Sequence, residues 1–175
     1  LASSRTLEIP VLALNHATEI NTPNNGLYQF ALSPENEATQ VAIRAWNQGL
    51  RNPVVLVPDN NWGKRIQMAF NETWQLLGGR TASEERYDAK QNDFSQPIRA
   101  ALELDLSDQR LKGLRTALRQ SIKFTPRRRQ DVDFIFIAAQ PRQARLLRPQ
   151  FKFHYASNLP VFSTSHAYQG KPDPQ

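Results

Sequence analysis

The chain has 175 residues, of which 39% are hydrophobic and 22% are charged, and this length allows one well-buried core. Cysteine is absent, which excludes disulfides and thiolate metal sites, and no apolar run approaches the roughly 20 residues that a membrane helix needs. The first residues lack the apolar centre of a targeting segment, so we expect an excised piece of a longer protein.

The net charge of +6 is concentrated in one region of the chain. Residues 1–109 contain 9 Lys and Arg against 13 Asp and Glu, whereas residues 110–152 contain 12 against 2. A basic region of this kind attracts anionic partners such as acidic protein surfaces, nucleic acid or anionic envelope polymers. Its plainer interpretation is the solvated faces of two helices.

Strand-like and helical patterns alternate along the chain. Apolar or β-branched runs predict strands near residues 9–15, 27–32, 54–57, 81–87, 132–139 and 159–164. Helical spacing of apolar residues predicts helices near residues 34–49, 62–77, 94–104, 107–122 and 141–148. In the fourth helix, Leu111, Leu114 and Leu118 are expected to mark the buried face. This alternation predicts an α/β fold, a three-layer lobe with a parallel sheet and right-handed crossovers.

Ligands of open parallel sheets bind at the carboxyl ends of the strands, so we searched the residues that follow each predicted strand. Trp62 could stack on a sugar or another ring, and the amides at the helix start beside it could bind an anion. The alternative is that Asn60 or Asn61 caps the helix and Trp62 packs at the edge of the lobe. The candidate cleft residues are Asn15, Asp59, Asn60, Trp62, Gly63, Ser165 and His166.

The sequence predicts no enzyme. The G-x-S-x-G, G-x-x-x-x-G-K-[ST] and G-x-G-x-x-G motifs are all absent. His16, His154 and His166 are widely separated in the sequence and form no compact ligand pattern, so we expect no metal and no cofactor. Ser165 and His166 are neighbours, and neighbours on a strand point to opposite faces, which disfavours a nucleophile and base pair. We therefore expect no catalytic residues.

A second candidate surface is basic. Arg142, Arg145 and Arg148 recur every three residues and Lys152 follows, so these side chains can share one helix face and form a docking stripe for a partner. Beyond them, Phe151, Phe153 and Tyr155 alternate with cations, as in a base-stacking platform. Without a recognition helix or an RNP-like pattern, an edge segment with its aromatic side against a helix is favoured, and no nucleic-acid partner is expected.

Several blocks of the sequence, in the same order, closely resemble the LpoA/LppC family of bacterial lipoproteins. The resemblance covers nearly the whole chain, and ordered blocks are more specific than a single short motif. The matching blocks are residues 9–15, 28–35, 55–58, 62–63, 133–139, 141–145 and 159–166.

The resemblance implies a type I periplasmic-binding-protein fold of two α/β lobes within residues 1–169. Residues 33–165 would supply most of the second lobe, residues 1–32 the end of the first lobe and the crossover, and residues 170–175 an extended tail. The implied function is non-catalytic activation of a class A penicillin-binding protein, the bifunctional peptidoglycan synthase. Peptidoglycan itself would be a further partner. An open alternative is a receptor that binds a solute or muropeptide in the cleft between the lobes.

The family is also attached to the outer membrane of Gram-negative bacteria and faces the periplasm. The attachment is a lipidated cysteine, and because this chain has no cysteine, we expect the anchor in sequence outside it. Contact with the membrane would then be made only through that anchor.

Overall fold

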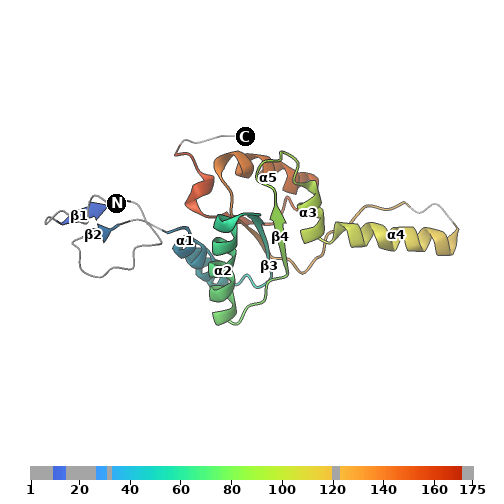
Figure 1. Ribbon diagram of the computed structural model, residues 1–175. Helices are drawn as coiled ribbons and strands as arrows, with labels where there is room; N and C mark the ends of the chain where they lie inside the picture. Colours follow the sequence, from blue (N-terminus) through green and yellow to red (C-terminus); the bar gives the residue numbers. More distant parts are fainter. Residues whose placement is uncertain (1–9, 15–26, 31–32, 120–122, 171–175) are drawn as a thin grey trace.

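The computed structural model describes residues 10–14, 27–30, 33–119 and 123–170. At its centre, four strands form a parallel sheet in the order β4-β3-β5-β6, with helices on both faces (Figure 1). The predicted α/β class with a three-layer parallel lobe is confirmed. The sheet strands are β3 (Pro53–Pro58), β4 (Ser83–Tyr87), β5 (Phe134–Ile137) and β6 (Val161–Ser163).

Two further strands pair with each other and not with this sheet. β1 (Val11–Ala13) and β2 (Leu27–Gln29) are parallel, with Leu12 opposite Tyr28. Both of these side chains are exposed. The assignment of residues 1–32 to a first lobe stays a prediction.

Helices α1 (Pro34–Asn47) and α2 (Asn61–Leu76) cover one face of the sheet. Ser33 caps α1 by accepting the Asn36 N–H at 3.0 Å, as the Ser-Pro pattern predicts. In the core of this face, Phe70 stacks on Phe136 with ring centroids 4.4 Å apart, and Trp74 lies edge-on to Phe134 at 5.5 Å. This aromatic cluster joins α2 to the centre of β5.

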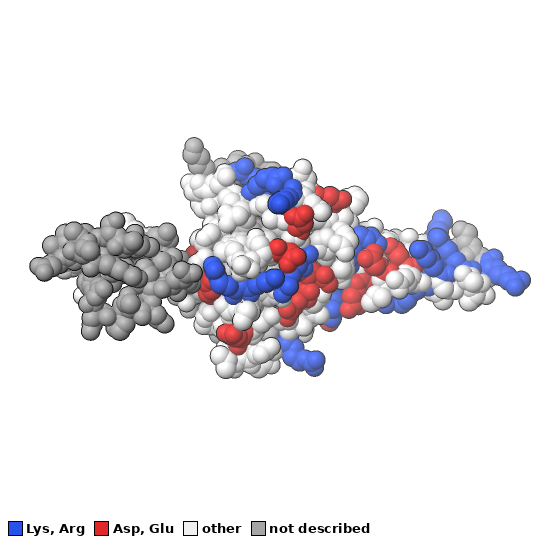
Figure 2. All heavy atoms as spheres, in the orientation of Figure 1, with Lys and Arg blue, Asp and Glu red and all other residues white. Residues whose placement is uncertain are grey.

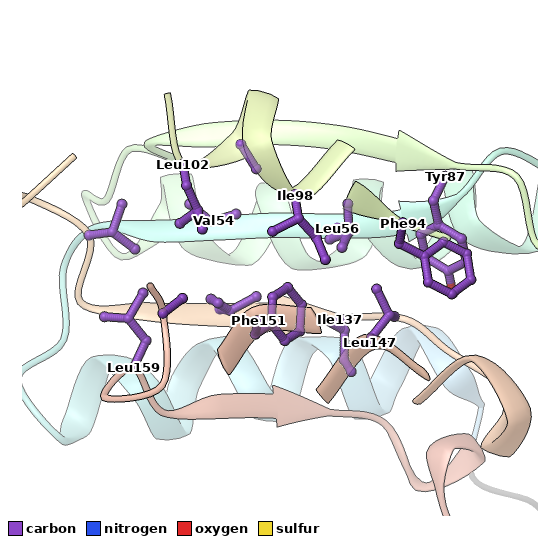
Figure 3. Packing of buried hydrophobic residues seen from close by; sticks show 14 of the residues in the cluster. Val54, Leu56, Tyr87, Phe94, Ile98, Leu102, Ile137, Leu147, Phe151 and Leu159 are labelled. Atoms are coloured by element: carbon purple, nitrogen blue, oxygen red, sulfur yellow. The ribbon is translucent and has the colours of Figure 1, made fainter. Parts of the chain in front are cut away.

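Helices α3 (Ser95–Ala101) and α5 (Pro141–Phe153) cover the other face. Figure 3 shows Leu56 and Ile137 of the sheet meeting Ile98 and Phe151 of these helices. At the edge of this layer the Tyr87 hydroxyl donates to the carbonyl oxygen of Ala138 at 2.7 Å. Burial raises the pKa of Tyr87 far above its ordinary range, so this donor keeps its proton.

The predicted end of α5 is wrong. The helix continues through Pro149 to Phe153, although a proline inside a helix removes one backbone hydrogen bond and its ring crowds a carbonyl of the preceding turn. The last turn persists because Phe151 is buried and the His154 N–H bonds to the Gln150 carbonyl at 2.9 Å. Tyr155 then reverses the chain with a φ of 62°, so the expected aromatic edge segment does not form.

Helix α4 (Leu104–Leu118) also departs from expectation. It projects away from the sheet and packs mainly against α3 (Figure 1). Leu111 is nearly buried, but Leu114 and Leu118 are 52% and 57% exposed, so the prediction that all three are buried is wrong. Helical spacing identified the apolar face of α4 without showing whether a neighbour covers it.

None of the helices in the described part of the chain is both long and apolar enough to cross a membrane.

The aromatic cluster predicts a large difference between two α2 variants. Phe70→Ala should lower the free energy of unfolding by about 3–5 kcal/mol, because it removes a fully buried ring and leaves a cavity. Leu76→Ala is the matched control, since Leu76 is 89% exposed on the same helix, and it should change stability by less than about 0.5 kcal/mol. Urea unfolding followed by circular dichroism measures both. Equal effects would show that α2 is not packed as described.

Candidate functional site

The carboxyl ends of the four sheet strands lie at one edge, and the chain leaves β3 and β5 there in opposite directions. From β3 the chain passes through α2 to β4, which lies at one end of the sheet. From β5 it passes through α5 to β6, which lies at the other end. The gap between β3 and β5 is therefore the topological switch point, where open α/β sheets bind ligands. Four of the predicted cleft residues, Asp59, Asn60, Trp62 and Gly63, follow β3 at this point.

Two of these residues have a structural function. Asn60 caps α2 by accepting the Gly63 N–H at 2.8 Å, so the capping alternative is correct for Asn60. Gly63 is buried, and a Cβ atom at this position would lie 2.1 Å from the Pro58 carbonyl oxygen. A glycine is therefore needed for α2 to start this close to the end of β3.

Trp62 and His166 bring the ends of β3 and β6 together. Their ring centroids are 5.6 Å apart at a tilted angle of 57°, and both side chains are partly buried. Trp62 also packs beside the aromatic core of the α1 and α2 face. The Nδ1 atom of His166 is buried without a hydrogen-bond partner among the described residues. The pair thus forms an aromatic wall at the edge, with one unused polar atom.

Ser165 has a partner that the sequence did not reveal. It opens the short 3-10 turn η2 (Ser165–Ala167), and its backbone N–H and hydroxyl both donate to the Glu37 carboxylate, each at 2.6 Å. This clasp joins the first turn of α1 to the segment that leaves β6. Glu37 and Ser165 are 128 positions apart, so no local pattern could have paired them.

A groove of about 390 Å³ lies beside this clasp, between α1 and the end of β6. Arg44 contributes a cation to its wall. The hydroxyls of Ser163 and Thr164 are buried there without partners among the described residues. The groove can therefore offer a small polar molecule both hydrogen-bonding groups and a charge.

An ion pair fixes the starts of α1 and α2 at the same edge. Arg65 Nε donates to Glu35 Oε1 at 2.7 Å. Partial burial acts to raise the pKa of the Glu35 carboxyl, but a backbone hydrogen bond and Arg65 outweigh it and hold the pKa below its ordinary value.

The structure divides the predicted basic stripe. Arg142 donates to Asn92 and points toward the loop before α3, and Arg145 donates to Gln169 at 3.0 Å. Arg148 borders a small hollow of about 270 Å³ between α5 and β6, and Lys152 is exposed one turn further on. Figure 2 shows basic side chains gathered over α5. Asn15 lies outside the described residues.

The described part of the chain contains no group of three or more His, Cys, Asp or Glu that could hold a metal ion. Ser165 and His166 lie in a 3-10 turn, not on a strand as the sequence suggested, and the Ser165 hydroxyl is engaged by Glu37.

The switch point and the three layers define an open α/β lobe, and solved structures that share this fold are periplasmic-binding-protein-like. Full-length LpoA from Haemophilus influenzae has a TM-score of 0.54 and 28% identity, covering 91% of this chain and 24% of that chain. Its C-domain alone has a TM-score of 0.53 and 26% identity, covering 90% of this chain and 40% of that chain. A solute-binding protein from R. palustris in complex with 4-hydroxybenzoate has a TM-score of 0.60, covering 91% of this chain and 38% of that chain. At 17% identity it shows the fold alone.

The chain belongs to the family described as LppC putative lipoprotein, whose model matches residues 1–175. The penicillin-binding protein activator LpoA of Aliivibrio fischeri is 31% identical over 147 residues, which are 84% of this chain and 24% of that protein. The protein of the same name from Vibrio cholerae is 33% identical over 146 residues, with 83% and 24% covered. The chain thus spans about a quarter of the length of these relatives. The predicted family is confirmed.

The clasp predicts a stability difference between two neighbouring positions on α1. Glu37→Ala should lower the free energy of unfolding by about 1 kcal/mol, because two donors lose a charged acceptor at a partly solvated site. Gln40→Ala, one turn further along the same helix, should have little effect. Chemical denaturation measures both. Equal free energies of unfolding in the two variants would show that the clasp contributes nothing to stability.

Proposed function

We propose that the whole protein is a non-catalytic activator of a class A penicillin-binding protein and regulates peptidoglycan synthesis by docking. The similarity to proteins named penicillin-binding protein activator, over more than four fifths of this chain, carries the proposal. The H. influenzae C-domain, described as a regulator of PBP1A, supports it as well. The proposed location is the periplasm of a Gram-negative bacterium. There the protein would be attached to the outer membrane by a lipid anchor outside this chain, with peptidoglycan as a further partner.

Activation without catalysis requires a difference in affinity. The activator must bind the active state of the synthase more tightly than the inactive state, because equal affinity for both states shifts nothing. The proposed docking surface on the lobe is the stripe of Arg142, Arg145, Arg148 and Lys152. Arg148 and Lys152 favour this surface because both are exposed on the same side of α5.

Charge reversal tests this surface. Arg148→Glu with Lys152→Glu should weaken binding of the full-length protein to the synthase roughly tenfold at low salt, and the loss should shrink as salt rises. Lys64→Glu with Arg80→Glu changes the net charge equally at exposed positions away from α5 and should have little effect. Biolayer interferometry against the purified synthase measures both. Unchanged affinity of the α5 variant would refute docking through this stripe.

The alternative function is a receptor for a solute or muropeptide. The groove beside Glu37 and Ser165, and the aromatic wall of Trp62 and His166, favour it. Isothermal titration of the full-length protein with muropeptides and amino acids should then show saturable binding, and Trp62→Ala should abolish it. Absence of heat with every compound would remove this alternative.

A further inference from the structure

Helix α4 and the segment that returns from it form a projection, here called the arm, comprising residues 104–118 and 123–127. The inner half of its apolar face is covered, since Leu104, Ser107 and Leu111 are buried. In the outer half the same face continues as Leu114 and Leu118, and Phe124 follows in the returning segment at 38% exposed. Exposed apolar side chains on one face of a helix are typical of an interaction surface.

The root of the arm is fixed to the lobe on both sides. Where α4 begins, Arg99 of α3 forms ion pairs with Asp105 at 2.7 Å and Asp108 at 2.6 Å. Where the segment returns, the Arg127 N–H donates to the Ser107 hydroxyl at 3.2 Å. The arm is therefore held in one direction although its outer half lies away from the sheet.

A left-handed residue sets that direction. Glu103 has a φ of 55°, a conformation that is uncommon for a residue with a side chain. Arg129 holds it through an ion pair at 3.0 Å and also donates to the Ala82 carbonyl at 2.8 Å, beside the start of β4. The turn that directs the arm outward is thus tied to the sheet layer.

The arm is strongly basic. Between Asp108 and Asp131 the sequence has eight Lys and Arg and no Asp or Glu. Lys112 follows Leu111 on α4, Arg119 follows Leu118 at the C-cap of the helix, and both side chains are exposed. Figure 2 shows basic side chains along the outer part of the arm.

We propose that the outer half of the arm docks into an apolar groove rimmed by carboxylates on the penicillin-binding protein. Leu114, Leu118 and Phe124 would enter the groove, while Lys112, Arg119 and Lys123 would pair with its rim. This inference rests on the proposed function and adds a contact that lies apart from the α5 stripe.

The charge of the arm selects this occupant over two others. A second copy would bring two strongly basic arms together, and like charges across an interface are unfavourable. A lipid surface is a poor match because the apolar stripe exposed among the described residues of the arm is only a few side chains long. Residues 104–127 also contain no Trp or Tyr, the residues that anchor helices at membrane interfaces.

The test uses the full-length protein and the purified synthase. Leu114→Ser with Leu118→Ser should weaken binding at least tenfold at all salt concentrations, because the apolar contact is lost. Lys112→Glu with Arg119→Glu should weaken binding mainly at low salt. The control is Met68→Ser with Leu76→Ser, since these α2 side chains are 59% and 89% exposed, and it should stay within about twofold of the wild type. The thermal midpoint of the free protein should not change in the arm variants.

The other outcomes are decisive. Wild-type affinity in both arm variants overturns the inference and leaves the proposed function standing, whereas a wild-type protein that neither binds nor stimulates the synthase overturns both. A thermal midpoint lowered by several degrees in the Leu114 and Leu118 variant would show that the rest of the protein covers the stripe. Flotation with phosphatidylglycerol vesicles that the arm variants abolish would assign the stripe to lipid. A dimer that the arm variants dissociate would assign it to a second copy. Each of these three results also overturns the inference.

Discussion

Burial of β3 and β5 on both faces is the constraint on which the rest of the lobe depends. Residues Val54–Val57 and Phe134–Phe136 are at most 1% exposed, so each strand needs a helical layer on either side. The stacked pair Phe70 and Phe136 and the opposing pair Ile98 and Leu56 belong to the two layers that meet this need. Helical layers on both faces require crossover connections, which make the strands parallel and place all their carboxyl ends at one edge. The candidate cleft follows from that placement.

The sequence predicted what is determined locally. The runs of β3 and β5 and the Ser33 cap are short-range signals, and the structure has each element where they indicated. Two predictions failed because they depend on neighbours. The end of α5 was expected near residue 148, yet burial of Phe151 holds a further turn. The leucines of α4 suggested a buried face, but spacing cannot supply the partner that would bury it. The Glu37 and Ser165 clasp lay beyond prediction for the same reason.

The edge of the sheet combines structural and unassigned residues. Asn60 and Gly63 are explained by the cap and by the close approach to Pro58, so neither needs a ligand to account for it. His166 and the buried hydroxyls of Ser163 and Thr164 are not explained in this way, because the described residues leave a buried polar atom of each without a hydrogen-bond partner. A buried polar group without a partner is unfavourable unless water or a ligand satisfies it. Activation by docking needs no ligand at this edge of the sheet.

The fixed root of the arm lowers the cost of ordering when a small surface binds a partner. The described residues of its outer half expose three large apolar side chains, and a flexible segment with a surface of that size would lose much of its interaction energy in becoming ordered on binding. The ion pairs of Arg99 and the contacts of Arg129 hold the arm in place before any partner arrives, which reduces that cost. They also connect the arm to α3 and to the start of β4, which are packed parts of the lobe. A partner bound at the arm would therefore be positioned relative to the sheet, and a second contact at α5 would act as part of the same rigid unit, raising the combined affinity beyond that of either contact alone.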